Sequence, residues 1–310
     1  MSNNHLMNTY SQWPVTFISG EGAYLKDDRG DAYLDFVGGI AVNALGYKHE
    51  GLAAVIREVL DSGVLHVSNL YYNAHVLEAA KKLAALSGME KVFFCNSGAE
   101  ANEAALKLAR KWGSGKNKST IISMLDSFHG RTYAAVTATG QKKYHRHFAP
   151  LPPGFVYAHF NDLDSVKALV DERTCAVIVE PIQGEGGIVP ATKEFLHGLR
   201  DLCDTHDLLL IYDEVQCGMG RSGKPFAHQP YGVKPDILTT AKALAGGVPA
   251  GAMLTQGEAS DGFVPGDHAS TFGGNALAAR AALHLCETLH RATSPSHLES
   301  DGRFPRKKPT

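Results

Sequence analysis

The sequence predicts an α/β protein with a mostly parallel sheet, and three observations lead to this fold class. Short apolar runs without polar alternation recur from residue 91 onward, and strands buried on both faces have this pattern. Segments with helical spacing separate these runs. Residues 175–214 read as a strand, a helix and a strand, which is the crossover unit that parallel strands require.

The N-terminal part of the chain differs from this pattern. Residues 22–36, GAYLKDDRGDAYLDF, form two short alternating runs around a turn-rich tetrapeptide at 28–31. We predict that they fold as a small hairpin at the edge of the molecule. Residues 50–87 then have helical spacing and are predicted to be helical.

The rest of the chain alternates between predicted strands and helices. Strands are predicted at KVFFCNS (91–97), STIISML (119–125), CAVIVEP (175–181), LLLIYDE (208–214), DILTT (236–240) and GAMLTQ (251–256). Helices are predicted after Ser97, near residues 193–206 and at about 276–290. Ligands of open α/β sheets gather at the carboxyl ends of the strands, so we expect the chemistry just after each apolar run.

Composition and charge exclude several classes of partner. With 310 residues, 44% hydrophobic content and 20% charged residues, the chain is long enough for one large globular domain with smaller lobes. A formal net charge of −2 gives no electrostatic footprint for nucleic acid or an anionic membrane. The N-terminus has no export signal and no stretch is as long and apolar as a membrane span, so we expect a cytoplasmic protein.

Cysteine and histidine usage predicts no metal site. The five cysteines are scattered without paired metal-ligand spacing, and the fifteen histidines form no pair beside a suitable acid. We expect reduced thiols, with Cys95 and Cys175 filling the core.

Two residues at predicted strand ends suggest chemistry. Asp213 closes the most apolar strand, where an acid is costly unless it has a cationic partner. Lys242 follows DILTT among small and apolar residues, and desolvation makes a lysine amine a nucleophile for carbonyl carbon. An amine and an acid at neighbouring strand ends suit pyridoxal phosphate, whose aldehyde reacts with the amine and whose pyridine nitrogen is kept protonated by the acid. A helix-capping role for Asp213 and Glu214 remains an alternative.

Two further motifs are compatible with that cofactor. Ser97, Gly98 and Ala99 immediately precede a helix, whose N-terminus can bind a phosphate, although a capping box with Glu100 needs no ligand. In DSFHGRTY (126–133), the ring of Phe128 can stack on a flat cofactor and Arg131 can grip a carboxylate. A core role for Phe128 and a surface ion pair for Arg131 remain open.

These motifs together resemble a known family. The matching segments are LDFVGGIAVNALGY (34–47), NSGAEANEAALKLAR (96–110), SFHGRT (127–132), VEPIQGEGG (179–187), DEVQCGMGRSG (213–223), KPDILTTAKALAGGVPAGAML (234–254) and STFGGNALA (270–278). Over roughly residues 10–285 the chain resembles the class III, fold-type I pyridoxal-phosphate aminotransferases, most closely the acetylornithine branch. The resemblance implies a mostly parallel seven-stranded sheet with helices on both faces.

The resemblance also implies roles for individual residues. Lys242 corresponds to the Schiff-base lysine and Asp213 to the partner of the pyridine nitrogen. The implied cofactor-binding residues are Gly98 and Ala99 at the phosphate, Phe128 against the ring, Gln216 on the O3′ side, and Glu214 and Val215 beside them.

The implied substrate contacts come from both subunits of an obligate homodimer with a shared active site. Ser270 and Thr271 match a pair that reaches the phosphate of the neighbouring subunit's cofactor. Arg131 and Ser270 match residues that contact acetylornithine. Glu185 matches a glutamate that acts as a switch between an ω-amino substrate and 2-oxoglutarate.

The expected domain organisation follows from the same comparison. We expect an N-terminal segment with an edge hairpin (1–50), a large cofactor-binding α/β domain (51–290) and a disordered, unrelated tail (291–310). The C-terminal small domain of such aminotransferases is expected to be largely missing, as if the chain were truncated.

The implied activity is transamination of N2-acetyl-L-ornithine with 2-oxoglutarate, which yields N-acetylglutamate 5-semialdehyde and glutamate in arginine biosynthesis. Two alternatives remain. One is another class III enzyme acting on ornithine, succinylornithine or 4-aminobutyrate, and the other is an inactive truncated product that binds pyridoxal phosphate.

Overall fold

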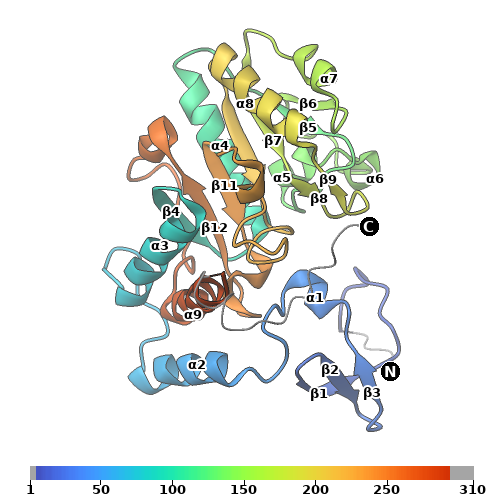
Figure 1. Ribbon diagram of the computed structural model, residues 1–310, viewed down its shortest axis with the longest axis vertical. Coiled ribbons are helices and arrows are strands. Elements are labelled where there is room, and N and C mark those ends of the chain that lie inside the picture. Colours follow the sequence, from blue (N-terminus) through green and yellow to red (C-terminus); the bar gives the residue numbers. More distant parts are fainter. Residues whose placement is uncertain (1–4, 294–310) are drawn as a thin grey trace, which may run out of the picture.

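A seven-stranded sheet with helices on both faces forms the centre of the computed structural model, which describes residues 5–293 (Figure 1). Its strands, in spatial order, are β4 (Lys91–Cys95), β12 (Gly251–Thr255), β11 (Ile237–Thr240), β10 (Leu209–Asp213), β7 (Thr174–Val179), β5 (Thr120–Met124) and β6 (Phe155–Ala158). Strand β12 pairs antiparallel with both of its neighbours, whereas every other pairing in this sheet is parallel. The predicted fold class is therefore confirmed.

The apolar runs form strands because both of their faces are covered. Successive side chains of a strand point to opposite faces, and Val177 and Val179 of β7 belong to one hydrophobic cluster while Ala176 and Ile178 belong to another. The first cluster includes side chains from α3 (Ala74–Ser87), α8 (Lys193–His206) and α9 (Ala276–Thr293). The second includes α4 (Gly98–Ser114) and α5 (Tyr133–Ala138).

Helix α8 shows how local sequence sets an element. Thr192 precedes it, and its hydroxyl accepts a hydrogen bond from the Phe195 amide at 3.1 Å. Its apolar side chains fall on one buried stripe, and Asp207 ends the helix in a left-handed conformation. The prediction of a helix at 193–206 is confirmed, and the predicted helix at 276–290 continues to Thr293.

The N-terminal region forms its own small sheet, which lies apart from the central one in Figure 1. Strands β2 (Tyr24–Asp27) and β3 (Ala32–Leu34) form the predicted hairpin, and β1 (Phe17–Glu21) adds a strand that was not predicted. The predicted helical stretch is divided into α2 (Glu50–Ser62) and α3. Gly63 ends α2 at a φ of 73°, which favours glycine.

The remaining elements are short. They are α1 (Gly38–Ala41), α6 (Lys142–His145), α7 (Leu163–Lys167), β8 (Ile182–Gln183), β9 (Val189–Pro190) and the 3₁₀ helices η1 (Gln229–Tyr231), η2 (Lys242–Ala245) and η3 (Gly257–Asp261). No helix between residues 5 and 293 has both the length and the apolar character that a membrane crossing needs. Most of the predicted tail at 291–310 lies outside the described residues.

Candidate active site

A cavity of about 400 Å³ lies where the carboxyl ends of the parallel strands meet. It brings together most of the predicted site. Of the predicted site residues, its lining includes Gly98, Ala99, Phe128, Arg131, Val215, Gln216 and Lys242. These residues follow β4, β5, β10 and β11, which explains how segments far apart in the sequence meet here.

Lys242 is the amine of this cavity. It opens η2 directly after β11 and has a φ of 48°, an uncommon backbone conformation for a residue with a side chain. The side chain is half-buried, and burial lowers the pKa of the amine, although the charges of Glu185, Asp213 and Glu180 oppose this shift. Its hydrogen bond to the Ile40 carbonyl, at 3.5 Å, is at the outer limit of such contacts. The amine is therefore held loosely and is available to react.

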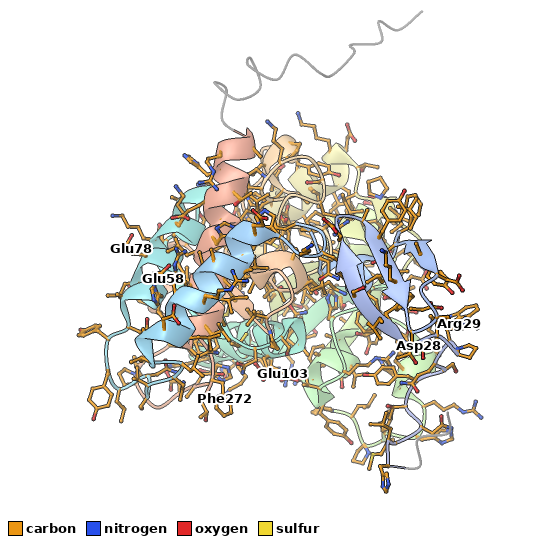
Figure 2. The ribbon with its side chains drawn as sticks, turned by 90° about the horizontal axis from the view of Figure 1, so that it is seen from below. Asp28, Arg29, Glu58, Glu78, Glu103 and Phe272 are labelled. Atoms are coloured by element: carbon orange, nitrogen blue, oxygen red, sulfur yellow. The ribbon has the colours of Figure 1, made fainter. Side chains whose placement is uncertain are left out.

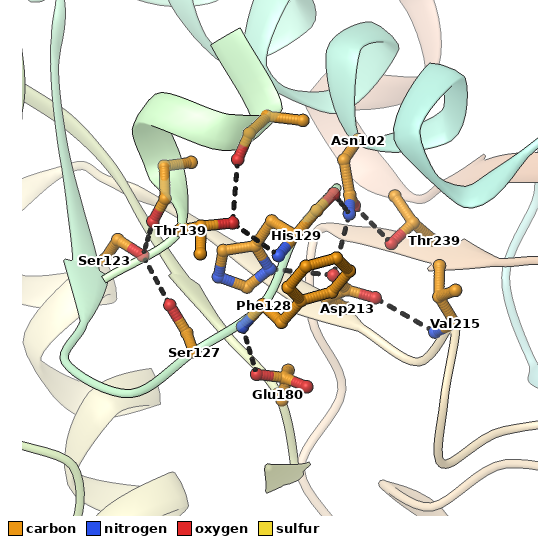
Figure 3. Close-up of polar contacts among 12 residues, drawn as sticks. Asn102, Ser123, Ser127, Phe128, His129, Thr139, Glu180, Asp213, Val215 and Thr239 are labelled. Carbon is orange, nitrogen blue, oxygen red and sulfur yellow. Dashed lines mark hydrogen bonds and ion pairs between the residues drawn. The ribbon is translucent and has the colours of Figure 1, made fainter. Parts of the chain in front are cut away.

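Asp213 is the buried acid, with 2% of its surface exposed (Figure 3). One carboxylate oxygen accepts a hydrogen bond from the Asn102 amide at 2.7 Å and lies 2.7 Å from Nδ1 of His129. The other oxygen accepts the backbone N–H of Val215 at 3.0 Å. Asn102 is itself fixed, because its side-chain oxygen accepts the Thr239 hydroxyl at 2.7 Å. These donors stabilise a negative charge beside the cavity.

His129 completes this pair and was missed by sequence reasoning. Burial alone would lower the pKa of its imidazole, but the hydrogen bond and charge of Asp213 raise it above its ordinary value. Its Nε2 atom is buried without a hydrogen-bond partner among the described residues. The position after Phe128 in a strand-end loop was the available signal, but one histidine among fifteen did not stand out.

Glu180 is a second buried acid below the cavity wall, with 1% of its surface exposed. Its carboxylate accepts the Phe128 amide at 3.1 Å and the Gly184 amide at 3.4 Å. Burial raises the pKa of this carboxyl group to about 7. Through its two hydrogen bonds, Glu180 joins the loop after β5 to the turn that contains Glu185.

The N-terminus of α4 provides the place for an anion. Ser97 caps the helix by accepting the Glu100 amide at 3.2 Å, while the Glu100 carboxylate bonds to Asn96 and not to Ser97 as a reciprocal capping box would require. The amides of Gly98 and Ala99 belong to the first turn, which has no intrahelical acceptors and carries the positive end of the helix dipole. Capping and anion binding are thus compatible.

Gln216 contributes an unused donor. Its Nε2 atom is buried without a hydrogen-bond partner among residues 5–293. A Cβ atom at Gly184 would lie 2.4 Å from its Oε1 atom, so the neighbouring turn can approach only because it has a glycine there. Each part of pyridoxal phosphate has a suitable group here. An amine can react with its aldehyde, and a fixed carboxylate can pair with its ring nitrogen. Free amides at a helix end can bind its phosphate, and an unpaired donor can bond to its ring oxygen. The residues present fit pyridoxal phosphate.

Besides Asp213, which lies beside the cavity, four predicted residues do not line it. The Glu214 side chain is fully buried and accepts hydrogen bonds from the amides of Ala227 and His228, so it does not point into the cavity. Ser270 bonds to Asn96 at 3.1 Å, and Thr271 is exposed. Glu185 is exposed in the turn between β8 and β9.

The sulfur and metal chemistry of the described chain is limited. All five cysteines are buried free thiols, which confirms the assignment of Cys95 and Cys175 to the core. Burial raises the pKa of Cys95 and of Cys175 to about 12. Within residues 5–293, no group of three histidine, cysteine or acidic side chains is arranged to hold a metal ion.

An α/β fold with a lysine amine and a fixed aspartate at its strand ends defines a pyridoxal-phosphate-dependent transferase. Comparison with known proteins identifies which class. The family model of class-III aminotransferases matches residues 6–300. The chain therefore belongs to the class-III aminotransferases, which depend on pyridoxal phosphate and act on small-molecule amino and keto substrates.

Individual relatives agree with this family. The chain is 54% identical over 288 residues to a succinylornithine transaminase of Salmonella typhimurium, covering 92% of the chain and 70% of that protein. It is 53% identical to an acetylornithine aminotransferase of Gloeobacter violaceus, covering 92% and 72%. Among solved structures, N-acetylornithine aminotransferase from Stenotrophomonas maltophilia has a TM-score of 0.76 at 39% identity, covering 90% and 70%. Ornithine aminotransferase from Toxoplasma gondii has a TM-score of 0.87 at 32% identity, covering 92% and 69%.

Proposed function

We propose that the chain transfers the δ-amino group of N2-acetyl-L-ornithine to 2-oxoglutarate, which gives N-acetylglutamate 5-semialdehyde and glutamate. The observation that carries this proposal is the half-buried amine of Lys242, whose pKa is lowered, in the same site as the fixed carboxylate of Asp213. The similarity to acetylornithine and succinylornithine transaminases supports an N-acylated ornithine as the donor.

Lys242 would act as the base. When bound, pyridoxal phosphate supplies a ring that withdraws electrons from the carbon next to the reacting nitrogen. Because burial favours its neutral form, the Lys242 amine can accept the proton from Cδ of the donor and later return one to Cα of the acceptor. Asp213 would keep a proton on the ring nitrogen, since its own charge is held by Asn102 and His129.

Other residues would place the cofactor and the donor. The first-turn amides of α4 at Gly98 and Ala99 would bind the phosphate, and the ring of Phe128 would lie against the pyridine. Arg131 would bind the α-carboxylate of the donor. Because the α-nitrogen is acylated and therefore neutral, this carboxylate is the only charge at that end of the donor. Glu185 would act as a switch between the ω-amino donor and 2-oxoglutarate.

We also propose that the enzyme works as a homodimer with a shared site. Ser270 and Thr271 lie outside the Lys242 cavity of their own subunit, which is compatible with a role at the cofactor of another subunit. Asn69 donates a hydrogen bond to the Ser270 carbonyl at 2.8 Å, which links the 63–73 connection to this loop. That connection carries exposed apolar side chains, namely Leu70, Tyr71 and Tyr72, and exposed apolar surface of this kind is typical of a subunit interface.

The first prediction tests the amine. Purified protein mixed with pyridoxal phosphate should show the visible absorbance of lysine-bound cofactor, and N-acetylornithine should bleach it. Lys242→Ala should abolish both the absorbance and glutamate formation from 2-oxoglutarate, with activity falling by several orders of magnitude because the attachment point and the base are lost. Lys224→Ala, which alters an exposed lysine, is the matched control and should behave as wild type.

Two outcomes would contradict the proposal. If Lys242→Ala retained the absorbance, the amine would be assigned wrongly. If the wild-type absorbance stayed unchanged with N-acetylornithine but was bleached by ornithine or 4-aminobutyrate, the donor would be wrong. Comparison of kcat/KM for acetylornithine and succinylornithine then decides between the two acyl groups.

A further inference from the structure

The guanidinium of Arg131 has an unusual set of contacts. It lines the cavity, yet no carboxylate and no hydrogen-bond acceptor within residues 5–293 pairs with it. Its contacts are with two aromatic rings: Cζ lies 4.1 Å from the ring centre of Tyr144 and 5.4 Å from that of Phe128. The two rings meet edge to face, with centres 5.6 Å apart and planes at 77°. Arg131 is therefore held by π faces and not by an acid.

Glu103 bonds to the residue that follows Arg131, and it uses one oxygen of its carboxylate to do so. This carboxylate, labelled in Figure 2, accepts the hydroxyl of Thr132 at 2.6 Å. The same oxygen accepts the amides of Ala134 at 2.9 Å and Ala135 at 3.1 Å, at the start of α5. Glu103 thus satisfies a helix N-terminus and makes no ion pair with Arg131.

Tyr144 is anchored to the loop that carries Arg131. It lies on α6, where Nε2 of the neighbouring His145 donates to the carbonyls of Val136 at 2.9 Å and Thr139 at 2.8 Å. The residue before the helix, Gln141, donates from its side chain to the Ser127 carbonyl at 2.9 Å. These bonds hold α6, which carries Tyr144, against α5 and the loop after β5.

The ring face, and not the hydroxyl, is the part of Tyr144 that is used. Its hydroxyl makes no hydrogen bond to any residue that the structure describes, while Lys143 also places its ammonium 4.8 Å from the ring centre. A π face attracts a cation but accepts none of the in-plane N–H groups of a guanidinium. An arginine held in this way keeps both its charge and its fork of donors for another ligand.

We propose that Tyr144 is a positioning residue that holds Arg131 with its donors free for a substrate carboxylate. This rests on the proposed function of Arg131 as the carboxylate-binding group. An acidic partner in place of Tyr144 would fix the side chain equally well, but it would neutralise the charge and occupy the donors. The Tyr144 ring therefore holds Arg131 in place and leaves its charge and N–H donors available to bind a substrate carboxylate.

Steady-state kinetics of the holoenzyme test the proposal. Tyr144→Leu removes the π face and should raise KM for N-acetylornithine and for 2-oxoglutarate by about 3- to 10-fold, while kcat stays within about twofold. Tyr144→Phe keeps the face, loses only the unbonded hydroxyl and should restore wild-type KM values. The affinity for pyridoxal phosphate should be the same in all three proteins.

Binding of glutarate, a dicarboxylate that cannot react, separates this proposal from the proposed function. Arg131→Met should weaken glutarate binding strongly, and Tyr144→Leu should weaken it by the same factor as KM. If Arg131→Met weakened binding but Tyr144→Leu did not, the role of Tyr144 would be overturned and that of Arg131 would stand. If Arg131→Met had no effect, the carboxylate assignment itself would fail. A fall in kcat or in cofactor affinity in Tyr144→Phe would also overturn the positioning role.

Discussion

Glu180 is a residue whose burial has a measurable cost. Its pKa is raised to about 7 by burial, whereas an unfolded chain would have a value near 4.5. Between these values the folded protein retains a proton that the unfolded protein has released. Stability from this group is therefore greatest at low pH, falls as the pH rises through this window and levels off above about 7.

This gives a prediction for Glu180→Gln, which cannot titrate. The difference in free energy of unfolding, wild type minus variant, should fall between about pH 5 and about pH 7 with a slope of up to about 1.4 kcal/mol per pH unit. Urea denaturation of the cofactor-free proteins measures it. Glu172→Gln alters an exposed carboxylate and should show no such slope. Parallel curves for wild type and Glu180→Gln would contradict the assignment.

The sequence allowed part of the site to be predicted at this scale. Lys242 and Asp213 were predictable because a charged group beside a buried strand is exceptional. His129 and Asn102 were not, because their partner lies on another strand end and only the folded chain shows the 2.7 Å contacts. Glu214 follows Asp213 directly in the sequence, yet its side chain accepts hydrogen bonds from the amides of Ala227 and His228, a direction that the sequence does not indicate.

At the scale of the element, the first turn of α4 depends on close packing. A Cβ atom at Gly98 would lie 2.6 Å from Cγ1 of Val215, which is closer than such atoms approach. Gly98→Ala should therefore displace the turn, lower the free energy of unfolding by about 1–3 kcal/mol and weaken pyridoxal phosphate binding at least about fivefold. Urea denaturation and cofactor titration measure the two effects.

The opposite end of the same helix provides the control. Gly115 has a helical backbone, and an added methyl group there would meet no neighbouring atom within 4 Å, so Gly115→Ala should leave cofactor binding unchanged. It should stabilise the protein by up to about 1 kcal/mol, because alanine restricts the unfolded chain. Equal effects of the two substitutions would show that helix propensity and not packing decides the outcome at Gly98.

The elements were predictable where apolar runs were long. Strand β6 was missed because its four residues, FVYA, follow a proline-rich stretch and show too short a run to separate from a loop. The break between α2 and α3 was missed because helical spacing continues on both sides of it. Gly63 was the available signal for the end of α2.

At the scale of the whole molecule, the shared site gives a prediction about mixed subunits. The loop of Thr271 lies at the periphery, where Phe272 is 61% exposed and lies 5.4 Å from His66, ring centre to ring centre (Figure 2). If Thr271 serves the cofactor of the other subunit, Lys242→Ala and Thr271→Asp subunits should complement each other. Each mixed dimer would contain one intact site.

The measurement is activity after the two inactive variants are unfolded together and refolded at equal concentration. About a quarter of the wild-type activity should return, because half of the dimers are mixed and each has one working site. Refolding each variant alone is the control and should restore nothing. An absence of recovery from a dimeric mixture would show that Thr271 serves its own subunit.

Helix α4 also sets the distance between two parts of the proposed cofactor site. Its first-turn amides would bind the phosphate, and Asn102, one turn further on, donates a hydrogen bond to Asp213, the proposed partner of the ring nitrogen. Because a helix rises about 1.5 Å per residue, one rigid element sets roughly 6 Å of the separation between these two contacts. With the cofactor bound as proposed, this spacing would select a cofactor of matching length, and an analogue with a shorter or longer arm to its anion would satisfy one contact only by losing the other.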